Sequence, residues 1–137
     1  MFKNKKDWKK QLTKEVFYIL WEKGTEPPFS GKLYHEKRNG TYHCAGCHNN
    51  LFKSVDKFDS GSGWPSFSDV ASRDSIILKD DNSFGKYRIE VLCKKCGGHL
   101  GHVFDNGPIS TRKRYCMNSL ALTFEASDKK KKNINVQ

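Results

Sequence analysis

The sequence predicts a mainly β domain with a helical N-terminal arm. Three observations lead to this fold class. Apolar residues recur at helical spacing only before Gly24, later segments alternate apolar and polar residues, and the length of 137 residues suits one domain. Aromatic residues make up 12% of the chain and can build a core where aliphatic residues are few. We therefore expect a single domain over residues 1–127 and a basic, disordered tail over residues 128–137.

The N-terminal arm is predicted to begin at Asn4, whose side chain can cap a helix. Thr13 divides the arm into two short helices, and Gly24 is expected just past the helix end as its C′ residue. Pro27 and Pro28 lack amide hydrogens and fix φ, so they predict an extended connector. The apolar side chains of the helical face are Trp8, Leu12, Val16, Ile19 and Leu20.

Strands are predicted from Gly31 onward. Ile76–Leu78 is a short β-branched run that ends at a turn-prone segment. Tyr87–Cys93 alternates apolar with charged residues, which is the period of a strand. Residues 114–125 alternate in the same way, and we expect one strand there. Its apolar face is expected to carry Leu120, Leu122 and Phe124.

The chain has a formal net charge of +10, from 25 Lys and Arg against 15 Asp and Glu. Such a balance can indicate binding to nucleic acid. However, nine of the cations lie near the ends, five between residues 3 and 10 and four at Lys129–Lys132. Terminal charge runs more often keep tails solvated than form a binding face, so a nucleic-acid partner is not expected.

No segment predicts a membrane span or a secretory signal. The longest apolar run, Val16–Trp21, has six residues, whereas a span needs about 20. Met1-Phe2 followed by lysines lacks the apolar stretch of a signal peptide. We therefore expect a cytoplasmic protein that does not associate with membranes.

Four of the five cysteines form two CxxC pairs, Cys44/Cys47 and Cys93/Cys96. Each pair can form a tight turn whose thiolates converge on one ion, and two such turns complete the tetrahedral site that zinc favours. The 45 residues between the pairs would then hold a whole β subdomain. A dithiol redox centre or two disulfides are the alternatives, although stable disulfides are not expected in a reducing cytosol. Four ligands leave no open position, so we expect a structural Zn²⁺, one per chain.

Cys116 is the remaining cysteine, and its neighbours give it a chemical context. An unpaired cysteine is by default a small buried hydrophobe. Strand period places Arg114, Cys116 and Asn118 on one face, about 7 Å between alternate residues. Arg114 would favour the nucleophilic thiolate, and Asn118 can donate a hydrogen bond to an oxyanion. The pattern predicts a pocket with Cys116 at its floor.

Two further segments are candidates to complete this pocket. Gly98–Phe104 carries His99 and His102 among glycines, which predicts a loop or irregular strand. Imidazoles can pass protons near neutral pH, although a second metal site or ordinary hydrogen-bonded histidines remain alternatives. Trp64 lies in a turn between Gly63 and Pro65, where it is either a ligand-facing ring or a core anchor.

Taken together, these segments resemble the methionine sulfoxide reductase B family, which reduces the R epimer of methionine sulfoxide. The GWPSF, HLGHVF and RYCMN strings are the most specific, and the resemblance covers roughly residues 7–126. It implies two small antiparallel sheets with an N-terminal helical arm, and membership of a zinc-bearing subgroup. The matching segments are Glu22–Gly31, Tyr42–Cys47, Lys57–Phe67, Gly97–Phe104 and Arg114–Ser119.

The resemblance also implies a role for each pocket residue. Cys116 would be the nucleophile that takes the sulfoxide oxygen as a sulfenic acid, the first step of cysteine oxidation. The methyl group on the substrate's sulfur would contact Trp64 and Phe104. The substrate would be methionine-R-sulfoxide, mainly in proteins or peptides. The residues that bind and protonate its oxygen would be His99, His102, Arg114 and Asn118.

One departure from the family pattern predicts how the enzyme is recycled. Many members carry a recycling cysteine in the GCGWPSF string, where this chain has Ser62. With four cysteines assigned to zinc, no internal thiol remains. We expect reduction of Cys116 by thioredoxin or another external thiol, and a monomeric enzyme.

Two other function classes stay open on sequence grounds. A zinc module that binds nucleic acid through its basic surface would explain the four paired cysteines and the charge. A zinc-fold protein that binds partners without catalysis is the second, because a fold does not by itself define a function. Neither assigns a role to Cys116.

Overall fold

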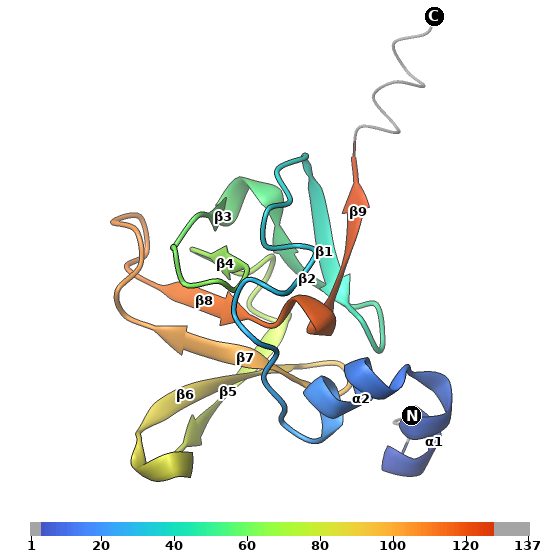
Figure 1. The fold of residues 1–137 in the computed structure, drawn as a ribbon. Helices are drawn as coiled ribbons and strands as arrows, with labels where there is room; N and C mark the ends of the chain where they lie inside the picture. Colours follow the sequence, from blue (N-terminus) through green and yellow to red (C-terminus); the bar gives the residue numbers. More distant parts are fainter. Residues whose placement is uncertain (1–3, 128–137) are drawn as a thin grey trace, which may run out of the picture.

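The computed structural model describes residues 4–127, so the tail predicted over residues 128–137 lies outside the described residues (Figure 1). The helices are α1 (Lys5–Gln11) and α2 (Lys14–Trp21), with 3-10 turns η1 (Ser54–Asp56), η2 (Ser83–Gly85) and η3 (Ser119–Ala121). The strands are β1 (Gly40–Cys44), β2 (Asn50–Lys53), β3 (Lys57–Phe58), β4 (Ser66–Phe67), β5 (Ile76–Asp81), β6 (Arg88–Cys93), β7 (His99–Phe104), β8 (Arg114–Met117) and β9 (Leu122–Ala126).

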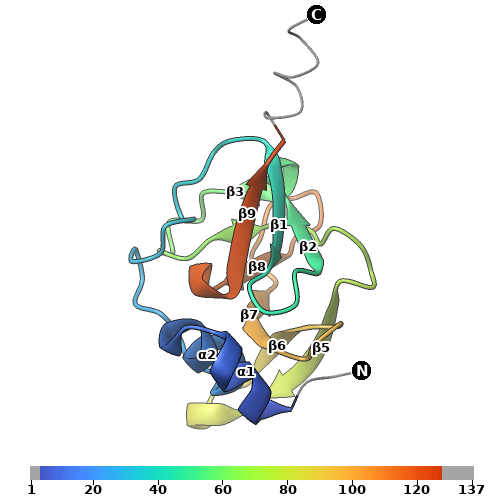
Figure 2. The ribbon, with the colours of Figure 1, turned by 90° about the vertical axis from the view of Figure 1, so that its right-hand side faces the viewer.

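The strands form two antiparallel sheets, as the fold class predicted. The smaller sheet has the order β2-β1-β9, and the larger has the order β3-β4-β8-β7-β6-β5. Figure 2 shows the smaller sheet in front, with the two helices below it. With seven and eight residues, neither helix is long enough to cross a bilayer, and no helix among residues 4–127 has the length and apolarity of a membrane span.

Aromatic side chains fill the space between the two sheets. The fully buried rings of Phe52 and Phe67 stack with their centroids 4.4 Å apart. Tyr42 meets Phe67 edge-on at 4.9 Å. Because Tyr42 and Phe52 belong to β1 and β2 while Phe67 belongs to β4, these contacts join one sheet to the other.

The helical arm divides at Thr13, as predicted. Asn4 Oδ1 accepts a hydrogen bond from the amide of Asp7 at the start of α1. Thr13 Oγ1 accepts from the amide of Val16 at the start of α2. Helix α2 packs against β7 and η3, with Ile19 and Leu20 almost completely buried. The arm therefore covers one end of the β domain.

The helix end differs from the prediction by one residue. Lys23, with φ of 53°, takes the left-handed position that was assigned to Gly24. The amide of Gly24 donates to the carbonyl of Tyr18, and a Cβ on Gly24 would overlap with the Tyr18 ring. Gly24 is therefore suited to its place by close packing and not by a positive φ.

The single strand predicted over residues 114–125 is wrong. The chain leaves the larger sheet after β8, makes the η3 turn and enters the smaller sheet as β9. Leu120, expected on an apolar strand face, lies in η3 and is 37% exposed. The amides of Ser119 and Leu120 bond to a buried carboxylate, that of Glu26, and not to a neighbouring strand. These hydrogen bonds to a residue distant in the chain interrupt the alternation.

The glycine-rich segment is an irregular strand, one of the two predicted possibilities. β7 pairs regularly with β6 from Val103 to Gly101, but Leu92 of β6 then pairs with His99, so Leu100 is an extra residue. Such a bulge shifts the alternation of side chains by one position. His99 and His102, three residues apart, therefore have rings only 5.5 Å apart.

Replacing Gly101 with alanine is expected to destabilise the fold. An added Cβ would overlap with the backbone carbonyl of Cys116 in β8, which has little room to move. We expect a loss of about 1–3 kcal/mol in the free energy of unfolding, measured by urea titration. Gly98→Ala is the matched control, because its Cβ would meet side-chain atoms of Leu20 at 3.2 Å. An equal loss in both variants would contradict this explanation.

Candidate active site

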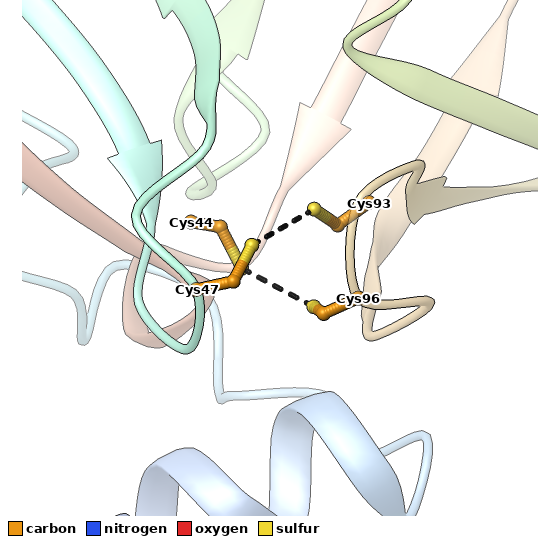
Figure 3. Close-up of side chains that lie close together, drawn as sticks. All are labelled: Cys44, Cys47, Cys93 and Cys96. Atoms are coloured by element: carbon orange, nitrogen blue, oxygen red, sulfur yellow. Dashed lines mark hydrogen bonds between the residues drawn. The ribbon is translucent and has the colours of Figure 1, made fainter. Parts of the chain in front are cut away.

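The four paired cysteines form one cluster between the two sheets (Figure 3). Cys44 ends β1 and Cys47 lies in the turn that follows it, while Cys93 ends β6 and Cys96 lies in the turn after that strand. The four sulfur atoms all lie within 4.8 Å of one another. The Sγ atoms of Cys44 and Cys96 are 3.8 Å apart, and those of Cys47 and Cys93 are 3.5 Å apart. The two predicted turns therefore converge.

This sulfur geometry fits a tetrahedral metal site. Four thiolates about 2.3 Å from one zinc ion would have sulfur–sulfur distances of about 3.8 Å. The amide of Gly46 lies 3.4 Å from Cys44 Sγ, and the amide of Gly98 lies 3.4 Å from Cys96 Sγ. Such donors stabilise thiolates that are bound to a metal. The cluster can hold a metal ion with four protein ligands.

Cys116 lies in the middle of the larger sheet. In β8 it is directly opposite Ser66 of β4 on one side and His102 of β7 on the other. Directly opposed residues of antiparallel strands project from the same face of the sheet. Cys116 and His102 both line a cavity of about 210 Å³. The cavity is lined by Thr25, Ser62, Trp64, Arg88, Gly101, His102, Phe104, Arg114, Cys116 and Asn118.

The environment of Cys116 has opposing effects on its thiol. Burial raises the pKa of Cys116, and this effect outweighs the guanidinium of Arg114 and the hydroxyl of Ser62, which both lower it. Arg114 favours the thiolate, as predicted from the sequence, but only partly offsets burial. Ser62 Oγ lies 4.0 Å from Cys116 Sγ.

Aromatic rings and a guanidinium form the walls of the cavity. The indole Nε1 of Trp64 donates to the carbonyl of Glu26 at 2.9 Å, which fixes the ring against the cavity. The guanidinium of Arg114 lies 4.5 Å from the centroid of the Phe104 ring. Arg114 Nε also donates to Oδ1 of Asn106 at 3.0 Å. The cavity thus combines apolar faces with fixed donors.

The two histidines have different environments. His102 is among the cavity residues, and its Nε2 lies 2.7 Å from Asp81 Oδ2. His99 is 3% exposed and does not appear among the cavity residues, and its Nδ1 lies 2.6 Å from Glu90 Oε2. Burial lowers the pKa of His99 in spite of the Glu90 carboxylate. The sequence indicated the same role for both rings, whereas only His102 reaches the cavity.

Asn118 lines the cavity with most of its amide group already engaged. Its Nδ2 donates to the carbonyl of Leu100 at 3.1 Å. Its Oδ1 accepts from the amide of Glu26 at 3.0 Å. The second hydrogen on Nδ2 is left to donate to an oxygen in the cavity, which is the hydrogen bond that the sequence predicted.

Three acidic residues around the cavity were missed by the sequence analysis. Glu26 is 3% exposed and accepts from the amides of Ser119 and Leu120 at 2.8 and 2.9 Å. Burial raises the pKa of Glu26. The carboxylate of Glu90 is hydrogen-bonded to His99, and that of Asp81 is hydrogen-bonded to His102. In the sequence, Glu90 is one of the charged residues of an alternating strand, and Asp81 belongs to a turn-prone segment. Neither pattern indicates that the carboxylate pairs with a histidine.

The chain is similar to known proteins along most of its length. The SelR domain model matches residues 12–126. A peptide methionine sulfoxide reductase MsrB of Methanosarcina barkeri is 54% identical over 129 residues, covering 94% of this chain and 91% of that protein. The mitochondrial methionine-R-sulfoxide reductase B3 of Mus musculus is 49% identical over 125 residues, covering 91% of this chain and 49% of that protein.

A solved structure shows the fold in a more distant protein. The Mis18 "Yippee-like" domain superposes with a TM-score of 0.52 at 18% identity, covering 64% of this chain and 96% of that domain. At this identity the likeness concerns the fold alone. The SelR match and the identity to the MsrB enzymes show that the chain belongs to the methionine sulfoxide reductase B family of oxidoreductases.

Proposed function

We propose that this chain reduces methionine-R-sulfoxide, mainly in proteins or peptides, to methionine through a sulfenic acid on Cys116. The main supporting observation is the placement of Cys116 directly opposite His102 in a cavity lined by Trp64. A cavity of about 210 Å³ is smaller than the roughly 300–1,000 Å³ of most small-molecule sites. It suits one side chain of a larger substrate.

The proposed chemistry follows from the donors around Cys116. The sulfur of a sulfoxide becomes electrophilic once its oxygen is protonated or strongly hydrogen-bonded. Donors on the oxygen side come from His102, Arg114 and Asn118. His99 acts indirectly, through the contact of its ring with that of His102. Overall, the Cys116 thiol and the sulfoxide become a sulfenic acid and methionine, so the oxygen atom moves from substrate to enzyme.

The apolar wall explains selection of one epimer. In the R epimer, the methyl group would contact Trp64 and Phe104 while the oxygen faces the donors. In the S epimer these two groups exchange places. The oxygen would then lie against apolar rings, where a polar group without a hydrogen bond is costly, and the donors would lose their partner.

Cys116→Ser is expected to abolish turnover of an R-sulfoxide peptide, because a hydroxyl is a far weaker nucleophile than a thiolate. Methionine formation is measured with separate R- and S-sulfoxide peptides and dithiothreitol as reductant. Cys47→Ser, which alters the cysteine cluster, is the comparison variant that loses activity through loss of folding. Circular dichroism distinguishes that cause from loss of the nucleophile. Turnover of the S form alone by the unaltered chain would contradict the proposal.

The same geometry supports recycling by an external thiol. The side chain that lies 4.0 Å from Cys116 Sγ is the hydroxyl of Ser62, and the other four cysteines belong to the cluster. The sulfenic acid would therefore be reduced by thioredoxin or another external thiol through a mixed disulfide. A reducing compartment such as the cytosol would keep the thiols available.

After one turnover without reductant, Cys116 is expected to be a sulfenic acid with no intramolecular disulfide. Mass spectrometry after trapping with dimedone measures the ratio of the two forms. Ser62→Cys is expected to convert the sulfenic acid to a disulfide, because its side chain would lie next to Cys116. A disulfide between Cys116 and a cluster cysteine in the unaltered chain would rule out the external-thiol route.

We further propose that the cysteine cluster binds one Zn²⁺ that stabilises the fold and takes no part in the reaction. Zinc prefers four thiolates in a tetrahedral arrangement, and four protein ligands leave no position for substrate. The cluster joins the end of β1 in one sheet to the end of β6 in the other. The ion would therefore hold the two sheets together.

Removal of this ion is expected to unfold the protein. Binding of a structural zinc contributes on the order of 10–16 kcal/mol, which exceeds the usual net stability of a small domain. Thermal unfolding is followed by circular dichroism with and without a chelator, and the metal is quantified by elemental analysis. A chelated protein that keeps its unfolding temperature would show that the ion is dispensable.

A further inference from the structure

One carboxylate contacts two basic side chains of the cavity. Asp81 ends β5 and pairs in register with Arg88, the first residue of β6. Its Oδ2 lies 2.7 Å from Nε2 of His102 and 3.6 Å from a guanidinium nitrogen of Arg88. Its Oδ1 accepts from the amide of Ser83 at 3.0 Å, which fixes the carboxylate plane. The side chains of Asp81 and His102 are only 14% and 12% exposed.

We propose that Asp81 is a positioning residue for the reduction, acting through His102. This inference rests on the proposed function of the cavity. By accepting a hydrogen bond from the Nε2–H of His102, Asp81 leaves Nδ1 as the nitrogen that exchanges a proton with Cys116 and with the sulfoxide. A carboxylate on one imidazole nitrogen orients the ring and stabilises the imidazolium.

The protons balance along this route. The neutral pair of His102 and the Cys116 thiol has the same number of protons as imidazolium and thiolate. When the thiolate attacks, the proton on Nδ1 goes to the sulfoxide oxygen. The bond from this oxygen to the substrate sulfur breaks and its bond to the Cys116 sulfur forms, so the sulfoxide is reduced by two electrons, Cys116 is oxidised by two, and the proton ends as the hydrogen of the sulfenic acid. His102 then returns to its neutral form, and its Nε2–H still donates a hydrogen bond to Asp81. No further reactant is needed.

The charges around His102 support this assignment. The hydrogen bond with His102 and those with Ser83 hold the pKa of Asp81 well below its usual range, so the carboxylate is charged at neutral pH. Arg88 faces the pair from β6, and Arg114 and Cys116 face the cavity from β8. Asp81 is thus a fixed negative charge between Arg88 and the His102 ring.

The second histidine–carboxylate pair lies outside the cavity. Glu90 is opposite His102 in register, but its carboxylate bonds to His99 and lies 3.5 Å from Nζ of Lys23. His99 is in ring contact with His102 and is not among the cavity residues. Glu90 therefore already has two partners, and Asp81 is the carboxylate that acts on the cavity histidine.

The test compares Asp81→Asn, Asp81→Glu and Asp80→Asn with the unaltered chain. Asparagine keeps an oxygen for the Ser83 amide but removes the charge from His102. Asp80 is the matched control, because it is the exposed neighbour and its Oδ1 accepts from the Tyr87 hydroxyl. Steady-state reduction of an R-sulfoxide peptide is measured with excess dithiothreitol from pH 5.5 to 9.5 (about the range that brackets imidazole and thiol titration).

In D81N, kcat near pH 7.5 is expected to fall by about 10- to 100-fold, a part of what general acid catalysis contributes. KM should change by no more than about twofold, because Asp81 is not among the cavity residues. The alkaline limb of the pH profile should move to lower pH, since the imidazolium is less stable without its carboxylate. D81E should keep the limb in place, and D80N should match the unaltered chain.

Three outcomes would overturn the inference: a D81N profile lowered equally at every pH, a D81N profile like that of the unaltered chain, or a D81E limb that moves. D81E and thermal unfolding keep the test decisive if D81N folds poorly. An unaltered chain that does not reduce the R-sulfoxide would instead overturn the proposed function. The two failures are therefore distinguishable.

Discussion

A single buried carboxylate, that of Glu26, holds the parts of the candidate active site together. Its oxygens accept hydrogen bonds from the amides of Ser119 and Leu120, at the turn where the chain passes from one sheet to the other. Its own amide donates to Asn118, and its carbonyl accepts from the indole of Trp64. A charged group is costly to bury unless it is hydrogen-bonded, so this arrangement is sharply defined. The connector after α2 is thereby tied to both walls of the cavity.

The cysteines divide into two groups because the sheets place them apart. The CxxC turns follow β1 and β6, strands of different sheets, and meet as one cluster. Cys116 lies two strands away from β6, separated from the cluster by β7. A residue in the middle of a sheet has its position set by hydrogen bonds on both sides, and register then determines its neighbours. Here the neighbours are His102 and Ser66.

Much of the site followed from local pattern. The alternation of Arg114, Cys116 and Asn118 placed three cavity residues on one face, as found. The spacing of the paired cysteines predicted one cluster. The pattern failed after Asn118, because hydrogen bonds to Glu26, 93 residues away from Ser119, replace strand pairing. It also failed to separate His99 from His102, because their different partners, Glu90 and Asp81, lie on other strands of the sheet.

The amino-acid sequence by itself determined the fold class, the helical arm with its cap at Asn4 and its division at Thr13, the cysteine pairs and the cysteine left outside them. These depend on residue type and on spacing within one segment. Only the tertiary structure decided which carboxylate meets which histidine, how far burial opposes Arg114 at Cys116, and where the last strand changes sheet. Each of these depends on contacts between segments distant in the chain, whose pairing is set by register and packing and leaves no local pattern.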